Sequence, residues 1–127
     1  MNKTRIFVAC ADERLRIALV LLLDQEPGIV IAGITDRLTG LITQLEATQP
    51  DIVLLEWKIP LQSIFDLLTG IHNLGNPPKV IYLSSKPEEE AKIIGAGADY
   101  FIAKNAPPDQ LVLILNKYSD QSQPYPT

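Results

Sequence analysis

The stretch DIVLLEWKIP, residues 51–60, is an apolar run that ends in a carboxylate, Glu56. Its first part, Ile52–Leu55, lacks polar alternation, which is typical of a strand buried on both faces of a parallel sheet. In such sheets ligands and chemistry gather at the carboxyl ends of the strands. Glu56 therefore stands where a functional site is expected.

Similar short apolar runs alternate with segments of helical period along the whole chain. The pattern predicts an α/β fold, a parallel sheet with helices on both faces. The predicted strands are Arg5–Cys10, Ile29–Ile34, Ile52–Glu56, Val80–Leu83 and Asp99–Ala103. Helices are predicted over Glu13–Gln25, after a cap at Asp36, after Ser63, from Pro87 and from Pro108 to about Tyr118.

The first helix, the fourth helix and the C-terminal segment carry further predictions. The first helix is apolar on most of its surface, so we expect it to be heavily buried. The fourth opens with KPEEE, where proline suits the first helical position and glutamates suit the positive end of the helix dipole, and it must close before GAGAD. Residues 119–127 have no apolar period and are expected to form a polar, proline-containing tail or linker after a domain of residues 1–118.

Composition limits the classes of function. The 127 residues suit one domain, and 46% hydrophobic with 20% charged residues suits a globular unit. The longest apolar run, Ile17–Leu23, is too short to span a bilayer, and a net charge of −4 does not favour nucleic acid. A single cysteine, Cys10, agrees with a reducing compartment, so we expect a cytoplasmic protein. The only histidine, His72, has no metal-binding companions and is expected at the surface.

The predicted strand ends carry Cys10, Glu56, Ser84 and Lys104. Together with LDQEPGIVIAG, PDIVLLEWKIP, GAGADYFIAK and APPDQL, this set resembles the receiver domain of two-component response regulators, especially the NarL/LuxR type. The resemblance covers residue 4 to about residue 118. It implies a (βα)5 flavodoxin-like (CheY-like) fold, a three-layer sandwich with strand order 2-1-3-4-5. Receivers are switches that take a phosphoryl group from a sensor kinase on an Asp at the end of the third strand.

The resemblance also assigns individual positions. It implies the phosphoacceptor position for Glu56, the phosphoryl-reading hydroxyl for Ser84, the rotating aromatic for Phe101 and the phosphate-binding lysine for Lys104. The acidic pair that holds Mg²⁺ in working receivers falls on Cys10 and Ala11, and neither offers the oxygen ligands that this cation prefers. We therefore expect no metal or other cofactor. A local shift could bring Asp12 back into a metal site, which leaves a phosphorylatable receiver as the alternative.

Glutamate at position 56 is a second departure from the family pattern. Its extra methylene moves the nucleophilic oxygen by about 1.5 Å, and misplacements near 1 Å can cost on the order of 100-fold in rate. The reach suits a salt bridge to Lys104, so the hypothesis is that Glu56 replaces the charge of a phosphorylated state. The simpler interpretations are a strand-end carboxylate in solvent, an ordinary surface lysine, and a turn residue at Ser84.

Two other functions remain open for Cys10. Residues Cys10–Arg16, CADERLR, match the C-x5-R spacing of cysteine-dependent phosphatases, but the loop lacks glycine and carries Asp12 and Glu13. A redox sensor would need a resolving thiol, which the sequence does not contain. A small buried thiol is the simpler interpretation.

The sequence thus predicts an atypical receiver that is not an enzyme and that works without ordinary phosphorylation. It would act on a protein partner, such as a regulator output domain or a sensor kinase, or on a second copy of itself, and not on a membrane. The stretch from Ser84 to Gly97 is shorter than usual in receivers, so we expect the fourth helix and the partner face beside it to be remodelled.

Overall fold

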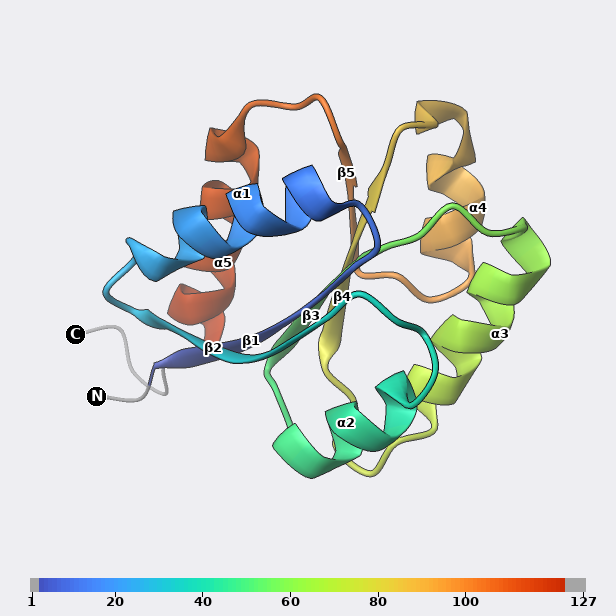
Figure 1. Cartoon of the computed structure of the whole chain (residues 1–127), viewed down its shortest axis with the longest axis horizontal. Coiled ribbons are helices and arrows are strands. Elements are labelled where there is room, and N and C mark those ends of the chain that lie inside the picture. The colour runs from blue at the N-terminus through green and yellow to red at the C-terminus, as the bar shows by residue number, and fades with distance from the viewer. Residues whose placement is uncertain (1–2, 123–127) are drawn as a thin grey trace.

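A computed structural model describes residues 3–122 of the chain. Within these residues five strands alternate with helices, as Figure 1 shows. The strands are β1 (Thr4–Cys10), β2 (Ile29–Thr35), β3 (Ile52–Glu56), β4 (Lys79–Ser84) and β5 (Tyr100–Ala103). The helices are α1 (Glu13–Asp24), α2 (Leu41–Thr48), α3 (Leu61–His72), the 3-10 turn η1 (Pro87–Glu89), α4 (Glu90–Gly95) and α5 (Pro108–Ser122).

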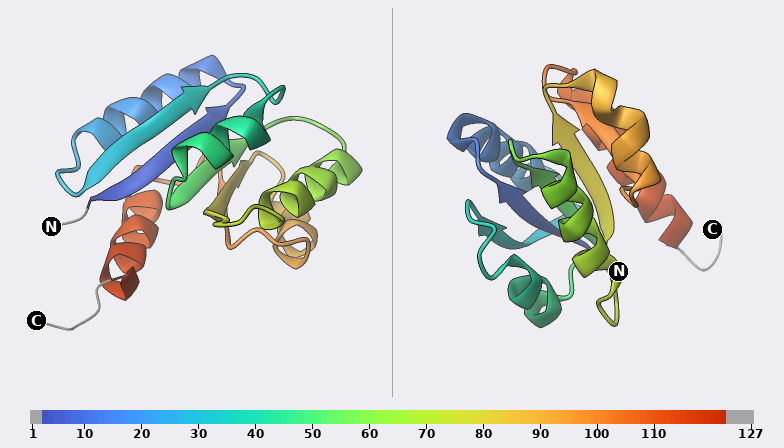
Figure 2. Two further views of the ribbon diagram at one scale, coloured as in Figure 1. Left: turned by 90° about the horizontal axis from the view of Figure 1, so that it is seen from below. Right: turned by 90° about the vertical axis from the view of Figure 1, so that its right-hand side faces the viewer.

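All neighbouring strands run parallel in the order β2-β1-β3-β4-β5, which confirms the predicted fold. Helices α1 and α5 cover one face of the sheet, and α2, α3 and α4 cover the other (Figures 1 and 2). A separate hydrophobic cluster fills each of the two spaces between sheet and helices. The molecule is therefore a three-layer sandwich.

The central strand β3 serves both clusters. Ile52 and Leu54 pack in the cluster under α1 and α5, whereas Val53 and Leu55 pack in the cluster on the α2, α3 and α4 side. All five residues of the strand are buried, as expected for the middle of a parallel sheet. Burying each aliphatic side chain contributes roughly 1.5–3 kcal/mol, so this strand anchors the fold.

Two aspartates stabilise the edge of the sheet where the strands begin. Asp51 precedes β3 and accepts a 2.8 Å hydrogen bond from the backbone N–H of Arg5 in β1. Asp99 precedes β5 and accepts an equally long bond from the N–H of Val80 in β4. Each carboxylate satisfies a strand-end donor that would otherwise lack a ladder partner.

The prediction that the first helix is heavily buried is wrong. Only Leu19 and Leu23 of α1 are fully buried, while Ile17 and Leu21 are 52% and 59% exposed. One stripe of the helix packs on the sheet, and the remaining apolar residues face away from it. The apolar run therefore reflects hydrophobic residues on both faces of the helix, of which only one face is covered by the rest of the protein.

Two predicted helix starts also need correction. Asp36 does not cap the second helix, because Gly40 at φ +80° redirects the chain and α2 begins at Leu41. Leu38 lies in the preceding loop but still packs against the core. Ser63 lies inside α3, which starts at Leu61 directly after Pro60. Both polar residues sit near a helix start, but the backbone turns are set by glycine and proline.

The short fourth helix is confirmed, since Pro87 opens η1 and α4 ends at Gly95. The fifth helix continues past the expected end at Tyr118 to Ser122, because extending an established helix by polar residues costs little. The predicted tail therefore begins later, and its residues 123–127 lie outside the described part of the chain. Across residues 3–122, no helix has both the length and the apolar character that crossing a bilayer requires.

One glycine is required by a close approach between neighbouring strands. Gly33 in β2 pairs with Phe7 in β1 just after a register shift, and the Phe7 ring lies where a side chain at position 33 would be. A Cβ there would sit 2.8 Å from Cδ2 of Phe7 and closer still to Cε2. Phe7 is fully buried and cannot move aside freely.

We expect Gly33→Ala to lower the free energy of unfolding by about 1–3 kcal/mol through overpacking against Phe7. Gly28→Ala is the matched control, because no atom lies within 4 Å of a Cβ built there. Urea denaturation of both variants measures the difference. Equal midpoints for the two variants would show that the Phe7 ring does not constrain position 33.

Candidate functional site

The carboxyl ends of the strands bring the predicted site residues to one edge of the sheet. Cys10 pairs with Glu56 in the β1–β3 ladder, and Ser84 pairs with Ala103, the residue before Lys104, in the β4–β5 ladder. Strand alternation places Glu56 on the same face as Ile52 and Leu54, toward α1 and α5. The strand thus ends by directing a carboxylate at the β1–α1 loop.

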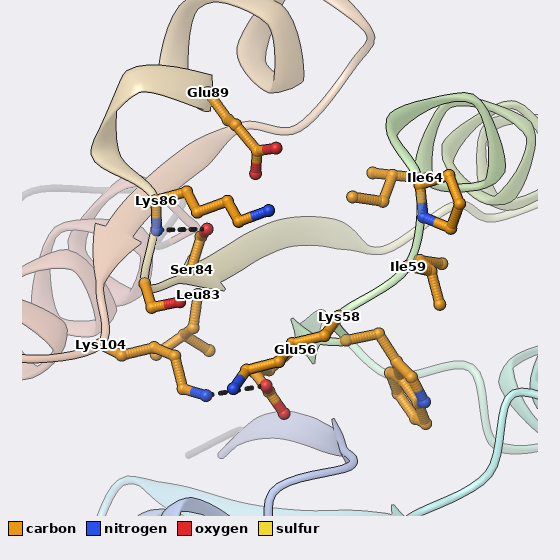
Figure 3. Close-up of a pocket in the computed structure, with 12 residues that line it drawn as sticks. Glu56, Lys58, Ile59, Ile64, Leu83, Ser84, Lys86, Glu89 and Lys104 are labelled. Carbon is orange, nitrogen blue, oxygen red and sulfur yellow. Dashed lines mark hydrogen bonds and ion pairs between the residues drawn. The ribbon is translucent and has the colours of Figure 1, made fainter.

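The Glu56 carboxylate is buried, with the residue only 2% exposed, and both oxygens have partners. Oε1 accepts hydrogen bonds from the backbone N–H groups of Ala11 (3.1 Å) and Asp12 (3.0 Å). The Cys10 thiol donates to the same oxygen at 3.3 Å. Oε2 accepts from Lys104 Nζ at 2.9 Å, so the predicted salt bridge is present (Figure 3).

Lys104 has a second carboxylate partner in Asp12. Nζ lies 3.2 Å from Asp12 Oδ2, while Asp12 Oδ1 accepts from the backbone N–H of Leu15 and caps α1. One ammonium group therefore joins the end of β3 to the start of α1 from a position directly after β5. Both oxygens of Asp12 are engaged, which differs from the free ligand that a shifted metal site would need.

The pKa values of this cluster shift as a buried ion pair requires. Burial acts to raise the pKa of Glu56, but the hydrogen bonds from Lys104, the Asp12 N–H and Cys10 together hold it below its ordinary value. Burial acts to lower the pKa of Lys104, and the bonds to Glu56 and Asp12 reverse this and raise it. The bond from the Leu15 N–H, followed by that from Lys104, lowers the pKa of Asp12.

Ser84 is buried and forms a local turn. Its Oγ accepts a 3.0 Å hydrogen bond from the backbone N–H of Lys86. This is the two-residue serine turn pattern, so the turn interpretation of Ser84 is confirmed. The proposed switch role of Ser84 stays a prediction.

Phe101 is half-buried on β5 and stacks against Tyr82 of β4, with ring centroids 6.3 Å apart and planes inclined by 21°. The Tyr82 hydroxyl donates a 3.0 Å hydrogen bond to the carbonyl of Trp57, the residue after Glu56. Sequence reasoning missed Tyr82. The signal was a tyrosine within the buried strand VIYLS, since a buried phenol requires a polar partner. Tyr82 links the strand end at Glu56 to Phe101.

The environment of Cys10 does not suit a phosphatase nucleophile. Burial first, then the hydrogen bond to Glu56, raises the pKa of the thiol to about 12, whereas catalysis needs a thiolate. The loop amides of Ala11 and Asp12 already bind Glu56, and Arg16 donates to the Cys10 carbonyl at 3.0 Å. The phosphate cradle of the C-x5-R alternative is therefore absent from this loop.

His72 is exposed, as expected, and its ring lies over Gly97. Among residues 3–122, no group of three or more His, Cys, Asp or Glu side chains is arranged to hold a metal ion.

The fold is that of a signalling receiver, and the side chains described above lie at the carboxyl ends of its strands. The family profile of the response regulator receiver domain matches residues 6–116, so the chain belongs to that family. Receivers of this family work in two-component signal transduction, where they interact with kinases and output domains.

Comparisons with individual proteins agree with this family assignment. The sensory transduction protein LytT of Bacillus cereus is 26% identical over 113 residues, which cover 88% of this chain and 46% of LytT. The chain thus spans about half the length of that relative. The receiver domain of NarL from Mycobacterium tuberculosis superposes with a TM-score of 0.77 at 20% identity, covering 94% of this chain and 98% of that one.

The receiver of the sensor histidine kinase PA1611 from Pseudomonas aeruginosa gives a TM-score of 0.76 at 15% identity, covering 91% and 97% of the two chains. That structure contains a magnesium ion coordinated in its active site cleft. At these identities the structural comparisons establish the fold alone.

We expect Glu56→Gln to lower the free energy of unfolding by about 1–3 kcal/mol, because it leaves Lys104 with one carboxylate partner. The pKa of Glu56 is depressed on folding, so its contribution is complete above its ordinary pKa of 4.5 and is lost as the pH falls through the folded-state value. The gap between wild type and variant should therefore be constant near neutral pH and shrink in acid.

Urea denaturation across a pH series measures this gap. Glu46→Gln, which removes an exposed carboxylate on α2, is the matched control and should show little effect. A gap that does not narrow in acid would contradict the assignment of the lost stability to the Glu56 charge.

Proposed function

We propose that this chain is an atypical receiver domain that signals through protein contacts without being phosphorylated in the usual way. The observation that carries the proposal is the engagement of the Glu56 carboxylate. One oxygen accepts from two loop amides and a thiol, and the other is paired with Lys104. A carboxylate held by this many donors is neither free to attack nor free to bind a metal.

The residues at the β1–α1 loop do not fit Mg²⁺. Cys10 is a protonated thiol and Ala11 has no side-chain oxygen, whereas Mg²⁺ requires oxygen ligands in octahedral geometry. The carboxylates that are present, Glu56 and Asp12, already share the ammonium of Lys104. Phosphoryl transfer depends on positioning and on neutralising the phosphoryl charge, so a cleft of this composition lacks its main catalytic element.

Glu56 takes the phosphoacceptor position in this proposal, and Lys104 takes that of the phosphate-binding lysine. Their ion pair holds the strand-end loops in one arrangement, as a phosphoryl group would do transiently. Ser84 and Phe101 take the switch positions. Tyr82, between the Trp57 carbonyl and Phe101, favours a fixed orientation of that aromatic ring.

The partner would be a protein in the same signalling system, namely an output domain, a sensor kinase or a second copy of the chain. Cytoplasmic placement and the absence of enzymatic activity are part of the same proposal. The stretch from Ser84 to Gly97 is shorter than usual in receivers, so the surface beside α4 is expected to be remodelled, and it is where such a partner would discriminate.

The direct test is incubation with acetyl phosphate and Mg²⁺, followed by intact-mass measurement. We expect no added phosphoryl group, because nucleophile and metal site are both altered. In parallel, Mg²⁺ and then beryllofluoride are titrated while the fluorescence of Trp57 beside the site is followed, and no saturable change is expected. Stoichiometric phosphorylation would show that Asp12 or another group restores the metal site and that the chain is a working receiver.

A gain-of-function variant provides the positive control. Cys10→Asp, Ala11→Asp and Glu56→Asp together reinstate the acidic pair and the shorter nucleophile. This triple variant should bind Mg²⁺ and gain phosphorylation by acetyl phosphate, provided that circular dichroism shows it folded. If it binds Mg²⁺ no better than the wild type, the composition of this loop is not what prevents metal binding.

A further inference from the structure

A pocket of about 360 Å³ lies beside the Glu56–Lys104 pair, on the side away from the β1–α1 loop. It is bounded by the segment after β3 and by the turn after β4. Figure 3 shows Glu56 and Lys104 at one end, Lys86 and Glu89 at the other, and Ile59 and Ile64 along one side. Its volume is at the lower end of the range of small-molecule sites.

Two of the lysines that line the pocket form no ion pair within the described part of the chain. Lys104 is neutralised by Glu56 and Asp12, but among the described side chains no carboxylate lies within 4.0 Å of the ammonium of Lys58 or Lys86. Lys86 reaches into the pocket from the β4 side, and Lys58 lies on the β3 side next to Glu56 (Figure 3). The carboxylates of Glu56 and Glu89 line the same pocket but lie beyond 4.0 Å from both ammonium groups, so each lysine remains available to an anion that approaches it closely.

Apart from the lysines and the carboxylates of Glu56 and Glu89, the pocket wall is apolar or carries hydroxyl groups. Ile59, Ile64 and Trp57 form an apolar side, and Leu83 continues it beneath the β4 turn. Ser84 and Ser85 add hydroxyl groups near Lys86. A pocket with two lysines that lack a close carboxylate and with an apolar wall matches a ligand that has an anionic group and an apolar body.

We propose that this pocket binds a small amphipathic anion, a carboxylate or a phosphate monoester, without covalent attachment and without metal. The anionic group lies between Lys58 and Lys86, and the apolar body packs on Ile59, Ile64 and Trp57. Glu89 at the rim limits the ligand to one anionic group, since a second one would face its carboxylate. The inference rests on the proposed function, because a cleft that is neither phosphorylated nor loaded with metal is open to such a ligand.

Binding would connect a small molecule to the surface that meets partners. The pocket joins the segment leading into α3 to the turn leading into η1 and α4. A ligand that bridges Lys58 and Lys86 ties these two segments together. The domain would then respond to a metabolite in place of a phosphoryl group.

The test uses the full chain in buffer with a chelator, with phenyl phosphate and phenylacetate as probes and inorganic phosphate as the anionic group alone. Trp57 fluorescence and calorimetry report binding. We expect at least one aromatic probe to bind saturably and more tightly than inorganic phosphate, and the better probe identifies the preferred anionic group. Lys58→Gln and Lys86→Gln should each weaken binding about five- to tenfold, while Lys117→Gln, an exposed lysine on α5, should not.

Absence of saturable binding by either aromatic probe at millimolar concentration would overturn the inference. So would unchanged affinity in the Lys58→Gln/Lys86→Gln double variant. If either result came from a chain that acetyl phosphate fails to phosphorylate, the proposed function would stand and only the ligand site would fall. A second titration replaces the chelator with Mg²⁺. Binding that appears only in this titration would overturn both, because it would mean that a working metal site exists.

Discussion

The structure depends on how one buried carboxylate is satisfied. Removing a carboxylate from water costs several kcal/mol unless donors replace the lost hydration. Glu56 meets this demand with two amides of the β1–α1 loop, the Cys10 thiol and the ammonium of Lys104. Because these donors come from different strand ends, satisfying one charge fixes several loops at once.

In the proposed function, the carboxyl ends of the strands carry a fixed ion pair in place of a bound metal ion. The PA1611 receiver, which shares this fold, contains a magnesium ion coordinated in its active site cleft. Here Lys104 is the cation, and its carboxylate partners are Glu56 and Asp12. A covalently tethered ammonium cannot exchange with solvent as a metal ion does, so under the proposed function the charge balance of the site would not depend on a sensor kinase.

The same edge separates two environments. On the β1–α1 side the charges are paired, whereas Lys58 and Lys86 line the pocket on the other side, and among the described side chains no carboxylate lies within 4.0 Å of either ammonium group. Tyr82 connects the end of β3 to β5, because its hydroxyl bonds to the Trp57 carbonyl and its ring stacks on Phe101. The ion-paired cluster and the proposed ligand site thus lie on different sides of one strand end.

Sequence reasoning was reliable for elements that a repeating pattern defines. It was less reliable for helix starts and side-chain exposure, which depend on single residues and their neighbours. Long apolar runs and their alternation defined β3 and the parallel sheet, since burial on both faces leaves no polar positions. The helix starts at Asp36 and Ser63 were wrong, because a polar residue near a helix has several local uses and only the backbone at Gly40 and Pro60 decides between them. The exposure of Ile17 and Leu21 could not be predicted, because it depends on which elements pack against α1.

The sequence by itself determined the order of strands and helices, the family, and the absence of the acidic pair at Cys10 and Ala11, because these follow from residue types and spacing. It also supplied the Glu56–Lys104 pair as a hypothesis. Only the tertiary structure decided that Asp12 shares Lys104, that the loop amides bind Glu56, and that Tyr82 joins Trp57 to Phe101. These contacts connect residues far apart in the chain, and their distances are fixed by strand register and loop conformation, which no local pattern encodes.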